Sequence, residues 1–197
     1  MARPKSDEKR SAILDAATHV IAAQGLSAPT ALIAKDAGIS TGSLFTYFGT
    51  KAELLNQLYV DLKTEMASTA LEGLPAGEDT RTQMAHMWSG WLRWATSEPD
   101  KRRTLAQLSV SDEITQQSRE IGHQAMSGVA ALLERSREKG VLRTAPLGLV
   151  ANLLNAVADA TVDFIIRDPA NADTHRTTGF DAMWRMISPD LVRTVTD

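Results

Sequence analysis

Apolar residues recur at intervals of three and four positions along almost the whole chain, and alternating β-branched runs are few. This periodicity predicts an all-α protein of about nine helices. Glycines and prolines mark the expected helix ends, most clearly in the loop at residues 73–77. The expected helices cover roughly residues 6–24, 30–37, 41–48, 50–71, 80–97, 101–108, 112–139, 146–168 and 175–187.

Hydroxyl residues mark where several of these helices begin. We expect Ser6 to cap the first helix and Ser40 or Thr41 to cap the third, because their side chains accept hydrogen bonds from the free N–H groups of a first turn. Thr50-Lys-Ala-Glu53 has the spacing of a capping box, which predicts a sharp start for the fourth helix. A turn at Gly38 separates the short second and third helices.

The third of these helices has an unusual composition. It contains Gly42, where alanine would favour a helix by about 1 kcal/mol. Phe45, Tyr47 and Phe48 lie within four positions of one another. Two short helices joined by a tight glycine turn are typical of a helix-turn-helix DNA reader, in which a glycine lets the backbone approach the DNA. The alternative is an ordinary core helix, but the turn glycine, the second glycine and the cap together favour DNA binding.

The polar side chains of this segment suit contact with DNA. Short hydroxyls can bind phosphates or base edges, and a tyrosine can pack its ring while its hydroxyl reaches a phosphate. Lys51 lies in the first turn of the fourth helix, where a basic side chain gains nothing from the helix dipole but can join a bound phosphate. The hydroxyl residues concerned are Ser40, Thr41, Ser43, Thr46 and Tyr47.

Residues 33–54 follow the pattern "IA..AG.S.G.L..YF..K..L", which resembles the N-terminal signature of TetR-family repressors. The resemblance implies a three-helix DNA-binding domain over residues 1–51 and a helical ligand-binding and dimerisation domain over residues 52–197. The opening "MARPKS" and the "DF..RDPA" segment at residues 163–170 are most similar to RamR-type repressors of multidrug-efflux regulators.

The same resemblance implies individual DNA contacts. Thr30 would contact a phosphate, and Ala31 replaces a residue that reads a base in many relatives. Because short side chains stand where longer polar ones are common, DNA shape and water are expected to carry much of the specificity for a pseudo-palindromic operator. Base contacts fall to Thr41, Gly42 and Ser43, with Phe45 and Thr46 beside them, and backbone contacts to Tyr47 and Lys51.

The larger part of the chain is expected to bind a small molecule. Methionine and tryptophan crowd residues 84–94 at helical spacing, which suits a pocket that repacks around different ligands but is equally typical of a core. By resemblance the ligand is an apolar or aromatic inducer. Lys63 opposes a purely cationic ligand and Asp159 favours one, so its charge stays open. The implied pocket residues are Tyr59, Lys63, Met66, Met84, Met87, Trp88, Trp91, Leu154 and Asp159.

The resemblance also implies a homodimer through the last two helices, whose recognition helices would lie about 34–36 Å apart on DNA. Small residues at positions 151, 156 and 160 would allow close helix approach. Core packing is again the alternative. The apolar stripes concerned are Val150, Leu154, Val157, Ala158, Thr161, Phe164 and Ile165 on one helix, and Phe180, Met183, Trp184 and Ile187 on the other.

The charge distribution argues against one further class of protein. The net charge of −3 combines six Lys and Arg against four Asp and Glu in residues 1–51 with an acidic excess in the rest. A ligand-blind architectural DNA-binding protein, the alternative function, would need a broadly basic surface, and a sequence pI near 5.8 argues against one.

Enzymatic chemistry has little support in the sequence. The chain has no cysteine, its four histidines are scattered, and it has neither a phosphate-binding glycine loop nor a nucleophile elbow. We therefore expect no enzyme, no metal and no cofactor. The longest apolar stretch, residues 147–166, is interrupted by polar residues and should not span a membrane, so a cytoplasmic protein is expected.

Overall fold

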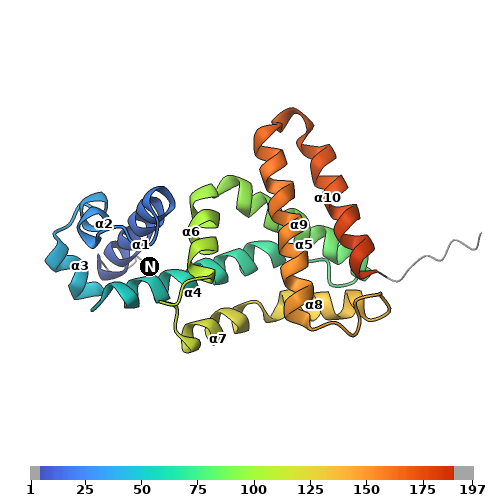
Figure 1. Ribbon diagram of the computed structural model, residues 1–197, viewed down its shortest axis with the longest axis horizontal. Coiled ribbons are helices and arrows are strands. Elements are labelled where there is room, and N and C mark those ends of the chain that lie inside the picture. Colours follow the sequence, from blue (N-terminus) through green and yellow to red (C-terminus); the bar gives the residue numbers. More distant parts are fainter. Residues whose placement is uncertain (1–4, 189–197) are drawn as a thin grey trace, which may run out of the picture. The chain divides into compact units, whose positions relative to one another are not determined.

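A computed structural model of the chain describes residues 5–188. Arg3 and the rest of the opening Met-Ala-Arg-Pro lie outside this range, as does Pro189, which was expected to follow the last helix. The described residues form ten α-helices and one short 3-10 helix without any strand, which confirms the all-α prediction (Figure 1).

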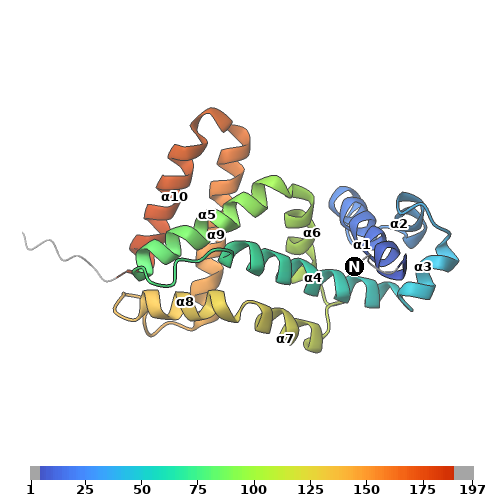
Figure 2. The same ribbon diagram turned by 180° about the vertical axis from the view of Figure 1, so that it is seen from behind.

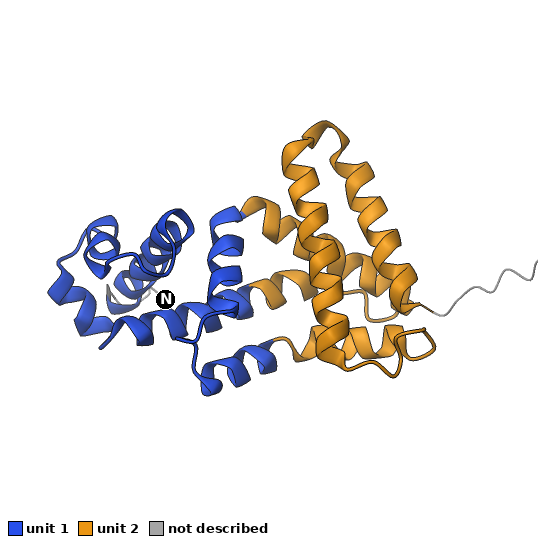
Figure 3. Cartoon of the chain, viewed as in Figure 1, with its two compact units in different colours: residues 1–65, 98–125 blue, residues 66–97, 126–197 orange. Residues whose placement is uncertain are grey.

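The helices divide between two compact units (Figure 3). The first unit comprises residues 1–65 and 98–125, and the second residues 66–97 and 126–197. In the first lie α1 (Lys5–Gln24), α2 (Thr30–Asp36), α3 (Thr41–Tyr47), most of α4 (Lys51–Leu71), α6 (Pro99–Ser109) and α7 (Gln116–Ala125). In the second lie the end of α4, α5 (Thr80–Ser97), α8 (Ser127–Arg137), α9 (Leu147–Arg167), η1 (Pro169–Asn171) and α10 (Ala172–Ile187).

The core of the first unit forms where the apolar stripes of its helices meet. α1 packs against both α2 and α6, and α2 packs against α3. Two side chains of α6 also bind the backbone of α1: Thr104 donates to the carbonyl of Thr18 at 3.0 Å, and Gln107 to that of Ile21 at 3.3 Å. The most deeply buried side chains are Ile13, Ile21, Ile33, Leu44, Leu54, Leu55, Leu58 and Leu108.

In the second unit α9 and α10 run side by side as a helical hairpin, visible from both directions in Figures 1 and 2. Gly179 of α10 makes this close packing possible. A Cβ at that position would collide with Thr161 of α9 and would lie 3.0 Å from Cζ2 of Trp88 in α5. The indole of Trp88 donates to the carbonyl of Arg176 at 3.2 Å, so its polar edge is satisfied within the unit.

The structure differs from the expected helices mainly between residues 112 and 139. One helix was expected there, but α7 begins only after Thr115, whose hydroxyl accepts from the backbone N–H of Ser118 at 3.2 Å. A break at Met126 then separates α7 from α8 and precedes the pair Ser127-Gly128, which is a poor helix former. At the N-terminus, α1 already contains Ser6, which is therefore not its cap.

Most residues of α9 that were predicted to form the dimer surface are buried within the chain, and other residues of the helix are exposed. Val150, Leu154, Ala158, Thr161 and Ile165 are buried within the chain. They therefore belong to its core and cannot be the surface that meets a second copy. A neighbouring face of α9 is exposed and apolar, and comprises Leu149, Leu153, Ala156, Ala160 and Phe164. We call these five residues the α9 stripe.

The apolar composition of α9 raises the question of a membrane. By length and composition alone it is the one described helix that could cross a bilayer, with a mean hydropathy of 1.6 over its most apolar window. A single helix of this kind is weak evidence for a span, because a helix with one face in a core and another in an interface has the same composition.

Arg137 at the end of α8 holds the connection to α9. It is only 6% exposed, and it donates to Glu134 at 2.7 and 2.9 Å and to the carbonyls of Leu142 and Ala145 at 2.7 Å each. A guanidinium presents several donors in a fixed plane, so one side chain satisfies several acceptors of this turn at once.

We predict that Arg137→Met lowers the free energy of unfolding by about 3 kcal/mol, because Glu134 and the carbonyls of Leu142 and Ala145 lose the buried guanidinium that donates to them. Chemical denaturation followed by circular dichroism measures the change. The matched control is Arg93→Met, at an exposed position of α5, which should change stability by less than about 0.5 kcal/mol. Equal effects of the two substitutions would contradict the role given to Arg137.

Candidate DNA-binding surface

The turn between α2 and α3 is built by local hydrogen bonds. Gly38 has φ +67°, and the N–H groups of Gly38 and Ile39 donate to the carbonyls of Lys35 and Ala34, which is a Schellman ending of α2. Ser40 then caps α3, because its hydroxyl accepts from the backbone N–H of Ser43 at 3.1 Å. The predicted turn glycine and cap are therefore both confirmed.

A helix as short as α3 is not stable by itself and must be held by its neighbours. Leu44 is fully buried, and Phe48, which follows the helix, is 2% exposed. Arg10 of α1 holds the other end: its guanidinium donates to the carbonyl of Tyr47 at 3.2 Å and to Gln57 Oε1 at 3.1 Å. The same guanidinium lies 4.4 Å from the centre of the Phe48 ring. A cation at a helix C-terminus also opposes the negative end of the dipole.

The opposite face of α3 is open to solvent. Thr41, Gly42, Ser43, Phe45 and Thr46 are all exposed. Gly42 has no conformational need for glycine, because its φ is not positive, and a Cβ there would come no closer than 3.9 Å to another side chain. A glycine that the fold does not require, on an exposed helix face, is expected where a ligand backbone approaches closely.

The hydroxyls on this face have different hydrogen-bonding roles. Thr46 donates to the carbonyl of Gly42 at 3.2 Å, so toward a ligand its oxygen can only accept. Ser43 accepts from the hydroxyl of Ser40 at 3.1 Å, which leaves its own hydrogen free to donate. The surface therefore offers one donor and one acceptor a single helical turn apart, which suits contacts with phosphates or base edges.

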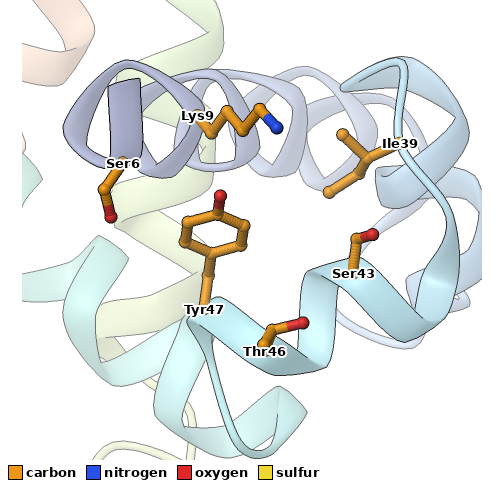
Figure 4. A pocket seen from close by; sticks show the side chains of 6 residues that line it. All are labelled: Ser6, Lys9, Ile39, Ser43, Thr46 and Tyr47. Carbon is orange, nitrogen blue, oxygen red and sulfur yellow. The ribbon is translucent and has the colours of Figure 1, made fainter. Parts of the chain in front are cut away.

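A pocket of about 380 Å³ opens between α1 and α3, lined by Ser6, Lys9, Ile39, Ser43, Thr46 and Tyr47 (Figure 4). Lys9 brings a positive charge beside the hydroxyl face of α3. Sequence reasoning assigned Lys9 no particular role, because no local pattern separates it from the other charges of α1. Its position depends on how α1 and α3 pack, and it is the functional candidate that sequence reasoning missed.

The ammonium group of Lys51 is engaged in hydrogen bonds within the fold, which the sequence did not suggest. Its ammonium group donates to the carbonyls of Leu26 and Ala28 at 2.7 and 2.8 Å, and so ties the turn after α1 to the start of α4. One of its three hydrogens is left for a phosphate. At the start of α2, Thr30 is partly exposed and Ala31 is exposed, and their contact with DNA stays a prediction.

The predicted ligand residues separate between the two units. Tyr59 and Lys63 lie in the first, where the Lys63 ammonium is 5.9 Å from the centre of the Tyr59 ring. The others lie in the second, where Met66, Met84, Trp88 and Leu154 are buried, Met87 and Trp91 are partly exposed and Asp159 is exposed. Trp88 lies 6.5 Å from Phe180, ring centre to ring centre, in the core of the unit. Binding of a ligand by these residues stays a prediction.

Known proteins resemble both the helix-turn-helix segment and the longer chain. Residues 13–58 match the model of bacterial regulatory proteins of the tetR family. The HTH-type transcriptional regulator YhgD of Bacillus subtilis (strain 168), itself uncharacterized, is 29% identical over 132 residues; the match spans 66% of this chain and 64% of YhgD, less than two thirds of that relative's length. The nucleoid occlusion factor SlmA of Shewanella woodyi is 24% identical over 196 residues, which cover 98% of both chains.

The similarity extends to three dimensions. The crystal structure of a tetR family transcription regulator from Shewanella sp. PV-4 matches with a TM-score of 0.82 and 26% identity, over 92% of this chain and 99% of the other. The helix-turn-helix segment thus matches the tetR family model, and nearly the whole chain is similar in fold to a tetR family transcription regulator.

Proposed function

We propose that the protein is a dimeric, ligand-responsive transcriptional repressor that binds a pseudo-palindromic operator. The observation that carries the proposal is the exposed face of α3, with its unneeded glycine, its free hydroxyl groups and the neighbouring Lys9. In the proposed division of labour, residues 1–51 read DNA, and residues 52–197 bind the ligand and the second subunit. The resemblance to RamR-type repressors extends the proposal to control of multidrug efflux.

The proposed mechanism is a shift between two populations. A small apolar or aromatic inducer would bind a state in which the two reading helices are wrongly spaced for the operator. A differential affinity of about 2.7 kcal/mol, near 100-fold, is enough to release most of the bound DNA at ordinary occupancy. The ligand acts only through this difference in affinity, because equal affinity for both states would leave the equilibrium between them unchanged.

Two other features of the proposal follow from charge and composition. A ligand-blind architectural DNA-binding protein is disfavoured, because such a protein needs a broadly basic surface and this chain is acidic overall. We also propose a cytoplasmic location, in which α9 meets a second subunit rather than lipid.

We predict selective, salt-dependent binding of the full chain to the DNA immediately upstream of its own gene. Fluorescence anisotropy against scrambled DNA of equal length measures it, over a range of salt concentrations. Lys9→Ala should weaken binding to both DNAs and reduce the slope of log affinity against log salt by about 0.9, the loss of one phosphate contact. The exposed Lys139, in the loop after α8, gives the control Lys139→Ala, which should leave the slope unchanged.

An unchanged slope for Lys9→Ala would remove Lys9 from the DNA contacts. Equal affinity for upstream and scrambled DNA would count against a sequence-specific repressor at that site. Selective binding that no ligand releases would favour the ligand-blind alternative. Lys51 is a poor test residue, because its replacement also breaks two hydrogen bonds within the fold.

Arg10 should behave differently from Lys9, because its guanidinium is occupied inside the unit. We predict that Arg10→Met lowers operator affinity about tenfold by loosening the end of α3, while the salt slope stays at its wild-type value. Arg10→Lys should recover part of the affinity, since an ammonium can still bind the carbonyl of Tyr47. A fall in the salt slope equal to that of Lys9→Ala would instead make Arg10 a direct phosphate contact.

The α9 stripe is the surface we propose for dimerisation. Leu149, Leu153 and Phe164 are 52, 39 and 53% exposed, and Ala156 and Ala160 between them allow a second helix to approach. In a twofold interface the same patch faces itself, so each residue is represented twice. The free face of α10 carries mainly polar residues and would form the edge of such an interface.

We predict that Leu153→Asp converts the dimer to a monomer, because two like charges would meet across the twofold axis. Sedimentation analysis at micromolar concentration measures the change, and operator binding should weaken with it. Ile166→Asp is the matched control, since Ile166 is 51% exposed on α9 but lies off the stripe. Dissociation by Ile166→Asp and not by Leu153→Asp would place the interface elsewhere.

A further inference from the structure

Tyr59 and Lys63 lie on one face of α4, where the tyrosine hydroxyl and the lysine ammonium group lack a hydrogen-bond partner within the described part of the chain. Tyr59 is only 3% exposed and Lys63 is partly buried. Among the described residues the Tyr59 hydroxyl has no hydrogen-bond partner, and the Lys63 ammonium contacts only the Tyr59 ring, at 5.9 Å from its centre. Neither polar atom is sealed from solvent, since no fully buried side-chain atom of the described chain lacks a partner. Both atoms are therefore accessible to solvent.

Residues of α7 and of the segment before it contact this part of α4 at two places. At one end, Asn56 accepts from the backbone N–H of Thr115 at 2.8 Å and donates to the carbonyl of Glu113 at 2.8 Å. Seven residues after Thr115, a Cβ on Gly122 would lie 2.9 Å from the Tyr59 ring, 3.3 Å from its hydroxyl and 3.4 Å from Cγ of Lys63. Only a glycine permits this approach, so the backbone of α7 forms one wall of the site.

The charges around the site are positive. Arg119, one turn before Gly122, donates to the carbonyls of Ser109 and Ser111, and its charge acts on Tyr59. Burial raises the pKa of Tyr59, an effect that the charge of Arg119 opposes. Burial also lowers the pKa of Lys63, and no carboxylate acts against that effect. An uncompensated ammonium group in such surroundings is costly to the fold and is stabilised by an anion.

We propose that Tyr59 and Lys63 bind the anionic group of the inducer, and that this inducer is a carboxylic acid with an apolar body. The site presents a hydroxyl donor and an ammonium donor one helical turn apart, without a competing acid. A carboxylate accepts from both, and such charge-assisted hydrogen bonds are the stronger kind. The inference rests on the proposed ligand-responsive function and adds to it the charge of the ligand, which the sequence left open.

Calorimetric titration of the full chain tests the inference with defined probes. These are decanoate and naphthoate, each compared with its primary alcohol and its primary amine. The carboxylates should bind at least about tenfold more tightly than the matched alcohols and amines. Lys63→Met should remove this preference while leaving the protein equally or more stable, because it deletes an unpaired charge. Lys139→Met, at an exposed lysine, should keep the preference intact.

A second readout is independent of any substitution. Reductive methylation followed by mass spectrometry reports access to each lysine, and decanoate should protect Lys63 but not Lys139. Tighter binding of an alcohol or amine, a carboxylate preference that survives in Lys63→Met, or no carboxylate binding up to about 1 mM would each overturn the inference.

Failure of this inference can be separated from failure of the proposed function. Operator binding and its release are measured by anisotropy on the same preparation, with the same six compounds. Release by an alcohol or an amine would leave a ligand-responsive regulator whose ligand is not anionic. Absence of selective operator binding would instead count against the regulator itself, whatever the compounds bind.

Discussion

The reading surface depends on the anchoring of one seven-residue helix. α3 is too short to persist alone, so its shape is set by the burial of Leu44, the Ser40 cap at its start and the Arg10 contact at its end. The first two are properties of the segment and its immediate core. The third ties α3 to α1 and, through Gln57, to α4. The position of the hydroxyl face is therefore a property of three helices at once.

The helix α9 carries two apolar faces with different surroundings. One face fills the core of its unit, where Gly179 brings α10 against Thr161. The other leaves a stripe of leucine, alanine and phenylalanine exposed to solvent. A helix with two apolar faces has a largely apolar sequence, which explains why the mean hydropathy of α9 is high enough to resemble a membrane span. It also explains why the sequence alone could not tell which face meets a second copy.

What could be predicted from the sequence was local. The Ser40 cap, the turn at Gly38 and the start of α4 at Thr50 each depend on residues within four positions of one another, and the structure contains all three. The break between α7 and α8 was missed because apolar spacing continues across it. The positions of Lys9 and Arg10 and the internal bonds of Lys51 depend on helices distant in sequence. No periodicity along one helix could reveal them.

α4 connects the proposed ligand group to the reading surface within a single helix. Lys51 at its start holds the turn before α2, Gln57 binds Arg10, and Tyr59 and Lys63 follow on the same helix. At 1.5 Å per residue, Lys51 and Lys63 are about 18 Å apart along the axis. An anion bound between Lys63 and α7 would lie beside Gly122, where the side chains of Tyr59 and Lys63 leave no room for a Cβ, and would press on the packing of the two helices. Because α4 carries both the Lys51 bonds and the Gln57 contact, a movement of α4 in the proposed response would be passed to α1 and to the turn before α2 by direct contacts.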